Sequence, residues 1–183
     1  MDGSPLAVSH ELCVPLGTAF ATGTRAVMRS LAIFAVVYAT AGLAQDGAKV
    51  NAGLEIWKSS GCADCHGAFA DGNPDDDDYP IGANLRTTRL DAAAVKLTIR
   101  CGRAGTGMPS FDQDAYTVRG CYGRPLGPAP DNLQPTPRTL SLDEIDTLIA
   151  YLQARIIGRG PITRDECLSY YYNSPGSSCD DLK

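Results

Sequence analysis

The sequence predicts an all-α domain, and three observations lead to this fold class. Two segments, over 48–60 and 141–156, place apolar residues at the spacing of one helix face, and a third, over 91–100, is bounded by a cap and a stop residue. Residue types that start or end helices stand at the limits of these segments. No run alternates apolar and polar residues as a half-buried strand does, and no internal repeat is present. We therefore expect helices joined by turns rich in glycine and proline.

The first predicted helix spans 48–60 and ends at Gly61. Its apolar face is formed by Val50, Leu54 and Trp57. The second predicted helix spans 91–100, with Asp91 as its N-cap and Gly102 as its stop. It ends shortly before a loop that contains a methionine.

The third predicted helix has the clearest signals. Ser141 and Glu144 have the spacing of a capping box at its start. The apolar stripe that follows is formed by Leu142, Ile145, Leu148, Ile149, Leu152 and Ile156. Two glycines and a proline within 158–161 are expected to end it.

Composition limits the function classes. The 183 residues carry a net charge of −5, from 16 Lys and Arg against 21 Asp and Glu. Nucleic-acid binding requires clustered basic residues, so this balance argues against a nucleic-acid partner. Aromatic residues make up only 7% of the chain, so a core of side chains alone would be small and a buried cofactor would help to fill it.

The N-terminal region predicts a secretory signal peptide over 1–44. Met28, an alternative translation start, and Arg29 precede an apolar run that begins at Leu31, and small residues follow up to Ala44. A membrane anchor is the alternative interpretation. The stretch is shorter than the roughly 20 residues that span a bilayer, so we expect a periplasmic protein without stable membrane insertion.

Cys62, Cys65 and His66 form the pattern Cys-x-x-Cys-His, which is typical of covalent c-type haem attachment. Two thiols separated by two residues on a helical turn can bond the two vinyl groups of one porphyrin. The adjacent histidine is then held under the ring with its imidazole toward the iron. The motif predicts one covalently bound haem c with His66 as an axial ligand.

Two other interpretations of the motif are a thioredoxin-like dithiol pair and part of a zinc site. A dithiol pair normally opens a helix after a strand, and no strand is predicted before Cys62. A zinc site needs further Cys or His ligands, and His10 is the only histidine besides His66. We therefore favour haem.

Met108 is the predicted sixth ligand of the haem iron. It is the only methionine after the signal region. The same part of the chain contains no histidine besides His66. It stands between small residues and Pro109, in a loop rather than on a helix face. A methionine ligand closes the iron site and raises its potential relative to a second histidine. The alternative is that Met108 packs in the core, leaving the iron five-coordinate or bound by a lysine.

Four further cysteines follow the motif: Cys101, Cys121, Cys167 and Cys179. In an oxidising compartment they can form two disulfides, with three pairings that the sequence does not distinguish. We favour Cys101 with Cys121 and Cys167 with Cys179, because each pair closes a short loop and leaves the haem crevice undisturbed.

Residues 47–157 resemble class I cytochromes c. Gly53 and Trp57 are similar to the glycine and the aromatic residue of the N-terminal helix in that family, and Tyr151 to the aromatic residue of its C-terminal helix. The loop over 81–85 is similar to the Gly-Pro-Asn-Leu loop of the family, with alanine in place of the proline.

This resemblance implies a class I cytochrome c fold over 45–160, with helices around one haem. The terminal helices would cross at the glycine, and a loop carbonyl would accept the Nδ1–H of His66. The chain departs from the family in an insertion over 112–138 and an extension over 161–183. Both resemble the elaborations of specialised cytochromes that serve one dehydrogenase.

Two further segments have simpler interpretations. The loop over 71–80 concentrates five carboxylates with a spacing similar to a calcium loop, but Asp76 and Gly82 occupy the positions of its glycine and its glutamate. We expect a solvated acidic loop and leave calcium binding at 71–78 open. Three tyrosines at 170–172 are expected to pack over the domain, pinned by a disulfide.

Together these features predict an electron carrier and not an enzyme, since no base, nucleophile or open metal position is evident. The expected donor is a periplasmic dehydrogenase, which the resemblance suggests to be a PQQ-dependent alcohol dehydrogenase. The expected acceptor is an oxidase or another cytochrome. The alternatives are a fixed haem c subunit of an oxidoreductase complex, and a five-coordinate haem enzyme or gas sensor. The sequence does not predict the individual partners or the reduction potential.

Overall fold

The computed structural model describes residues 46–74, 78–172, 179, 180 and 182. All of them belong to one compact unit, Leu43–Lys183. The predicted signal peptide over 1–44 therefore lies outside the described residues. Residues 75–77 of the acidic loop also lie outside them.

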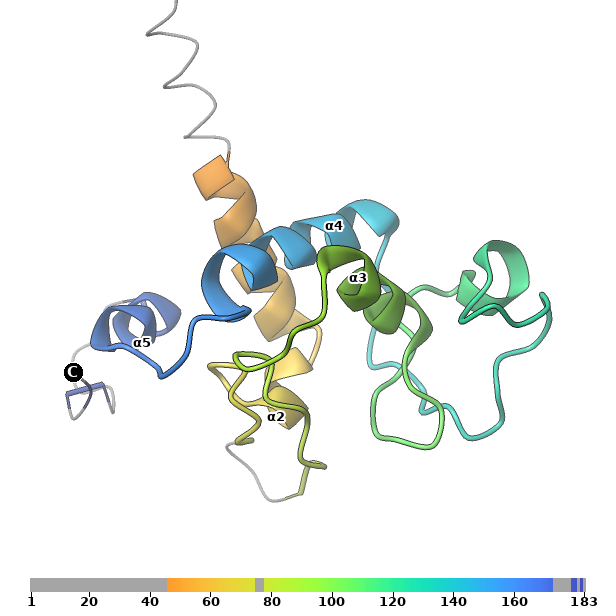
Figure 1. The fold of residues 1–183 in the computed structure, drawn as a ribbon, viewed down its shortest axis with the longest axis horizontal. Coiled ribbons are helices and arrows are strands. Elements are labelled where there is room, and N and C mark those ends of the chain that lie inside the picture. Colours follow the sequence, from red (N-terminus) through yellow and green to blue (C-terminus); the bar gives the residue numbers. More distant parts are fainter. Residues whose placement is uncertain (1–45, 75–77, 173–178, 181, 183) are drawn as a thin grey trace, which may run out of the picture. The chain divides into compact units, whose positions relative to one another are not determined.

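The described residues form helices and no strand, which confirms the all-α prediction. The first helix spans 46–59, and the later elements are visible in Figure 1. They are α2 (Cys62–His66), α3 (Ala92–Cys101), η1 (Ala115–Arg119), α4 (Leu142–Tyr151), η2 (Leu152–Ile156) and α5 (Arg164–Tyr170). The elements η1 and η2 are short π-helical segments, and η2 continues α4 directly.

Local signals set the helix ends where the sequence predicts them. The Asp91 side chain accepts a hydrogen bond from the Ala94 amide at 2.8 Å and caps α3. Ser141 and Glu144 form the predicted capping box at the start of α4. The continuous helix ends at Ile156, two residues before the first of the predicted stop glycines.

The helix over 46–59 crosses α4 at Gly53. A Cβ atom at Gly53 would lie 2.5 Å from both the Thr147 carbonyl oxygen and the Tyr151 Cβ, so only glycine permits this approach. The Trp57 ring is 2% exposed and lies 6.4 Å from the Tyr151 ring, measured between centroids. This close crossing anchors the core on which α3 also packs.

Two disulfides are present, Cys101–Cys121 and Cys167–Cys179, as the local pairing predicted. Among the described cysteines, Cys62 and Cys65 are the two that remain free. The chain therefore separates its structural cysteines from the pair in the predicted haem motif.

The last helix, α5, was not predicted. Thr163 and Glu166 form a capping box at its start, a signal that the sequence contains. Tyr170 packs on Phe69 with ring centroids 5.4 Å apart, and Tyr171 meets Tyr170 edge to face. The expectation of packing over the domain is therefore confirmed for Tyr170 and Tyr171, whereas Tyr172 is 65% exposed.

No helix among the described residues has both the length and the apolar character needed to cross a membrane.

Candidate haem site

The Cys-x-x-Cys-His motif lies on α2, the single helical turn that follows the helix over 46–59. Gly61, with φ of 71°, makes the left-handed turn between the two helices. Cys62, Cys65 and His66 all line one cavity. The turn therefore presents two thiols and one imidazole to a common space.

This cavity has a volume of about 480 Å³, within the range of about 300–1,000 Å³ for small-molecule sites. Its other walls are largely apolar and come from distant parts of the chain: Trp57, Ile81, Leu85, Val95, Ile99, Met108, Phe111, Leu148, Leu152 and Ile157. Such walls suit a large flat apolar group and exclude water from it.

His66 is oriented by a backbone hydrogen bond. Its Nδ1 donates to the Ala83 carbonyl oxygen at 2.8 Å, which is the type of bond expected from the loop over 81–85. Gly82 lies so close that a Cβ there would be 2.7 Å from His66 Nδ1 and from the Cys65 carbonyl oxygen. The bond fixes the tautomer and leaves Nε2 available to bind a metal.

Burial changes the acid–base behaviour of the motif. Desolvation, with the neighbouring Asp64 carboxylate, raises the pKa of the Cys62 thiol to about 12, and the pKa of Cys65 is also raised. Burial lowers the pKa of His66, and the bond to Ala83 partly opposes this effect. Neutral imidazole is the form that coordinates a metal, so this environment favours ligation.

Met108 lies in the loop between α3 and the insertion and contributes to the same cavity. Its amide donates to the Thr106 hydroxyl at 3.1 Å, and its carbonyl accepts from the Arg103 amide at 3.0 Å. The structure therefore brings Met108 and the motif to one cavity, although 42 positions separate Met108 from His66.

The residues present fit a haem. The two thiols are free, Nε2 of His66 is not used by its bond to Ala83, and a methionine shares their cavity. The indole Nε1 of Trp57, a residue that lines this cavity, is buried without a hydrogen-bond partner.

The thioredoxin-like interpretation of the motif finds less support. A helix, over 46–59, precedes α2 where a thioredoxin-like site would have a strand. Among the described residues, no three His, Cys, Asp or Glu side chains are grouped as ligands of a metal ion.

Several cavity residues were not predicted from the sequence. Arg103 and Thr88 add polar groups to its wall, and neither belongs to a spacing motif, because their place at the cavity depends on how two loops fold. Ile81, from the predicted loop over 81–85, lines the cavity while being 83% exposed.

In comparisons with protein-family models, with curated proteins and with solved structures, nothing matches this chain.

Proposed function

We propose that this chain is a c-type cytochrome of class I that carries single electrons through one covalently bound haem. The observation that supports it most is the convergence of Cys62, Cys65, His66 and Met108 on one apolar cavity. Each of these side chains has the chemistry that its role requires.

Cys62 and Cys65 would hold the haem by thioether bonds. Each thiol adds across one vinyl double bond, so that a sulfur–carbon bond forms and the thiol hydrogen goes to the other vinyl carbon. The raised pKa values keep both groups as thiols. No oxidant is consumed in this addition.

His66 Nε2 and the Met108 sulfur would be the two protein groups that bind the haem iron. The bond from His66 to the Ala83 carbonyl oxygen strengthens the imidazole as a ligand and holds its plane. When bound, the haem supplies one-electron redox chemistry at its iron. The apolar walls and the methionine ligand favour the reduced, less charged iron and raise the potential.

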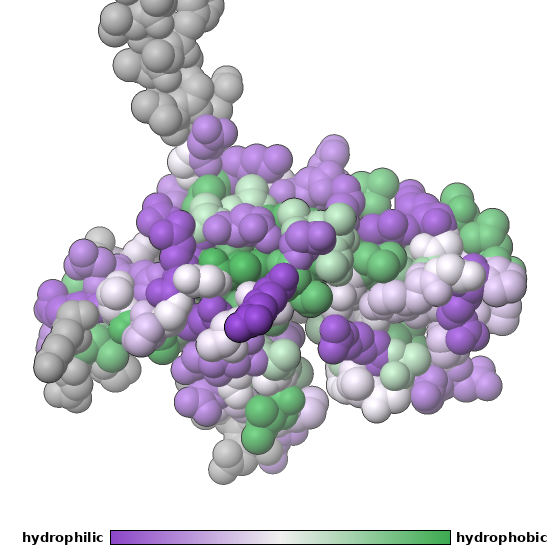
Figure 2. All heavy atoms as spheres, viewed as in Figure 1, coloured by the Kyte–Doolittle hydropathy of each residue, from purple (hydrophilic) through white to green (hydrophobic). Residues whose placement is uncertain are grey.

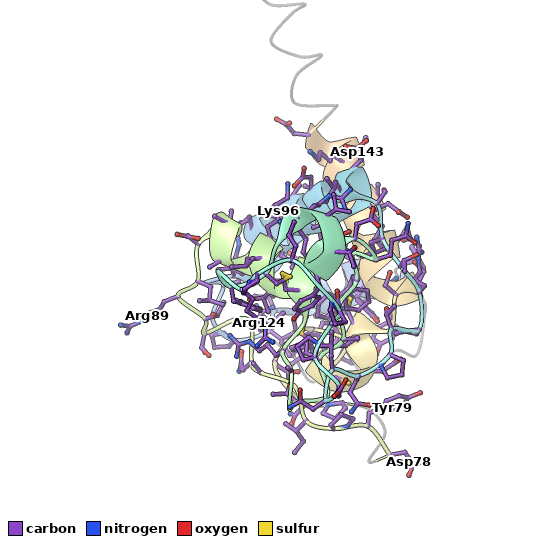
Figure 3. All side chains as sticks on the ribbon, turned by 90° about the vertical axis from the view of Figure 1, so that its right-hand side faces the viewer. Asp78, Tyr79, Arg89, Lys96, Arg124 and Asp143 are labelled. Carbon is purple, nitrogen blue, oxygen red and sulfur yellow. A yellow bond between two sulfur atoms is a disulfide. The ribbon has the colours of Figure 1, made fainter. Side chains whose placement is uncertain are left out.

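An exposed apolar edge beside the cavity supports exchange of electrons with another protein. Ile81 and Tyr79 are 83% and 45% exposed, and Ile81 lines the cavity. Figure 2 shows hydrophobic side chains at the tip of this loop, below α2. In Figure 3 the labelled Asp78 and Tyr79 lie together on this loop, away from Arg124 on the insertion.

Two disulfides are consistent with an oxidising compartment such as the periplasm. A diffusible carrier would accept electrons from a dehydrogenase, for which a PQQ-dependent alcohol dehydrogenase remains the suggested class, and pass them to an oxidase or another cytochrome. We rank a fixed haem subunit of an oxidoreductase complex second, because the insertion and the tail offer additional docking surface.

The test is the optical spectrum of protein expressed in a periplasm that attaches haem. We expect a low-spin oxidised spectrum with the weak red charge-transfer band of methionine sulfur on ferric haem. Met108→Ala should abolish this band and admit carbon monoxide to the reduced iron. Ile81→Ala, which changes the same cavity without removing a ligand atom, should keep it.

A protein that accumulates without covalent haem would contradict the proposed cofactor. A high-spin wild-type spectrum that binds carbon monoxide would instead favour a five-coordinate haem enzyme or gas sensor.

A further inference from the structure

The loop that carries Met108, residues 103–110, is here called the Met108 loop. Its internal bonds close it: the Arg103 amide donates to the Met108 carbonyl oxygen at 3.0 Å, and the Thr106 hydroxyl donates to the Arg103 carbonyl oxygen at 2.7 Å. These bonds give the loop a shape but do not attach it to the rest of the protein. Its attachment therefore depends on contacts with its neighbours.

The main attachment lies where the end of α3 meets Pro109. Gly102 has φ of 62°, and a Cβ there would lie 2.5 Å from the Pro109 carbonyl oxygen and 2.6 Å from the Ser110 nitrogen. The two backbone segments thus touch directly. Pro109 directly follows Met108 in the chain. The contact between Gly102 and Pro109 therefore links the position of Gly102 to that of the methionine.

Side chains of the insertion, residues 112–138, donate hydrogen bonds to two successive backbone carbonyl groups at this junction. The Tyr116 hydroxyl donates to the Cys101 carbonyl oxygen at 2.8 Å in the interior. The Tyr122 hydroxyl donates to the Gly102 carbonyl oxygen at 2.7 Å. The disulfide Cys101–Cys121 ties the same point covalently.

Tyr122 holds its position at a conformational cost. Its φ of 52° lies in the left-handed region, which residues other than glycine rarely adopt. The preceding Cys121 is fixed by the disulfide, and the hydroxyl bond holds the other end of the side chain. A strained residue at such a site indicates that the surrounding structure requires this geometry.

A separate contact secures the far side of the loop. The Gly105 amide donates to the Asn132 carbonyl oxygen at 3.0 Å, so a second part of the insertion also binds the Met108 loop. The insertion therefore bonds the backbone at Cys101, Gly102 and Gly105, three positions that precede Met108 in the chain.

We propose that the insertion is a positioning device for Met108, with Tyr116, Tyr122 and the Cys101–Cys121 disulfide as its positioning groups. It keeps the methionine sulfur in the cavity and resists its displacement by external ligands. This inference rests on the proposed function, because it assigns to the insertion the strength of the sixth ligand.

The experiment measures imidazole binding to the ferric haem protein, followed by loss of the red methionine band. Imidazole binds only where the methionine has left, so its apparent dissociation constant reports the population of the closed loop. Removing one hydrogen bond with Tyr122→Phe should lower this constant about fivefold, equivalent to about 1 kcal/mol. The double variant Cys101→Ala/Cys121→Ala should lower it further.

The tail offers matched controls. Tyr172 has φ of 55° and donates its hydroxyl to Glu55 at 2.6 Å, but it does not touch the Met108 loop. Tyr172→Phe, and the double variant Cys167→Ala/Cys179→Ala, should leave the imidazole constant within about twofold of wild type, a difference below about 0.5 kcal/mol. A role in general stability alone would move both sets of variants equally.

Hydrogen exchange gives a second readout that does not involve iron. The Arg103 amide, bonded to the Met108 carbonyl oxygen, should exchange faster in Tyr122→Phe than in Tyr172→Phe. If the double cysteine variant fails to fold, these two tyrosine variants decide the question.

The outcomes separate the two proposals. A wild-type protein with haem and the methionine band, but with equal imidazole constants in Tyr122→Phe and Tyr172→Phe, overturns the positioning role and leaves the electron carrier intact. A wild-type protein without haem overturns the proposed function itself. In that case, faster exchange of the Arg103 amide in Tyr122→Phe than in Tyr172→Phe would still show that the insertion holds the Met108 loop. Equal exchange rates in the two variants would refute it.

Discussion

The insertion over 112–138 and the tail over 161–183 are built by the same means. A local disulfide ties the insertion to the end of α3 and another lies within the tail, and each region contains a tyrosine with a left-handed backbone whose hydroxyl group is hydrogen bonded. These tyrosines are Tyr122 and Tyr172. In Figure 1 the insertion lies beyond α3 and α4, at the other end of the view from α5.

Their partners differ. The insertion binds backbone carbonyl groups beside the Met108 loop, whereas the tail binds side chains of the helix over 46–59. The Lys58 ammonium group lies 4.4 Å from the centre of the Tyr170 ring and 3.9 Å from that of Tyr172. The two disulfide-linked regions therefore contact different parts of the described chain.

The buried charges of the two regions also have opposite signs. Asp112, 4% exposed, bonds Arg100 and Arg119 at the base of the insertion. Arg86, 3% exposed, bonds Glu166 at 2.9 Å in the tail. Each buried charge has its counterion, and its removal should damage one region more than the other.

The largest expected effect is in the tail. Arg86→Met should lower the free energy of unfolding by about 3–5 kcal/mol, because Glu166 and the Gly160 and Pro161 carbonyl groups lose their partner. Urea unfolding measures this change. Arg164→Met removes the exposed ion pair with Asp180 and should cost less than about 1 kcal/mol.

An equal loss of unfolding free energy in Arg86→Met and Arg164→Met would contradict the expectation that the buried ion pair stabilises the protein more than the exposed one. The imidazole constant of Arg86→Met should stay near that of wild type if the tail does not act on Met108.

A smaller loss is expected in the insertion. Asp112→Asn should lower the free energy of unfolding by about 2 kcal/mol, because the amide keeps one acceptor oxygen for two arginines and the Asp114 amide. Unlike Arg86→Met, it should also tighten imidazole binding. Asp131→Asn, at an exposed aspartate of the insertion, is the control. The same loss of stability and the same change in imidazole binding in Asp131→Asn would show that the effect is not specific to the buried Asp112.

The capping boxes provide a finer comparison. Thr163→Ala should cost about 1 kcal/mol and loosen α5, so that limited proteolysis cuts the tail sooner. Ser141→Ala should cost a similar amount in the core helix α4, but it should leave the tail protected. Tail cleavage at the same rate in both variants would show that the two regions unfold together.

The smallest effect concerns pH. The Ser141 amide and hydroxyl, with Arg138, lower the pKa of Glu144 below its ordinary 4.5. The ionised carboxylate therefore adds stability that is complete above about pH 4.5 and is lost as the pH falls through the lowered pKa. Glu144→Gln should flatten the acid side of the stability profile, measured by urea unfolding between pH 3 and 7 in steps of about one pH unit. An unchanged slope would contradict this assignment.

Much of the helical framework could be predicted from the sequence because helix ends are set by local chemistry. Asp91 and Ser141 cap helices with neighbours three residues away, and both caps are present. The bond from His66 to a loop carbonyl was expected from the resemblance of the loop over 81–85 to its counterpart in class I cytochromes c. The helix α5 was missed, although the spacing of Thr163 and Glu166 contains its signal.

The remaining features could not be predicted because they depend on contacts between distant segments. Arg86 reaches Glu166 across 80 positions, and no short spacing encodes such a bond. The hydrogen bonds from Tyr116 and Tyr122 to backbone carbonyl groups also cannot be predicted from the pattern of apolar and polar residues. The roles of the insertion and the tail therefore required the fold.

The sequence by itself determined three of the helices, the pair of local disulfides as the favoured pairing, and the candidate roles of Cys62, Cys65, His66 and Met108. These depend on residue type and short spacing, which local backbone geometry converts directly into structure. Only the tertiary structure shows that Met108 lines the same cavity as the Cys-x-x-Cys-His motif, and that the insertion is hydrogen bonded beside the Met108 loop. The reason is that both depend on the path of the backbone between segments, which packing of the whole core fixes.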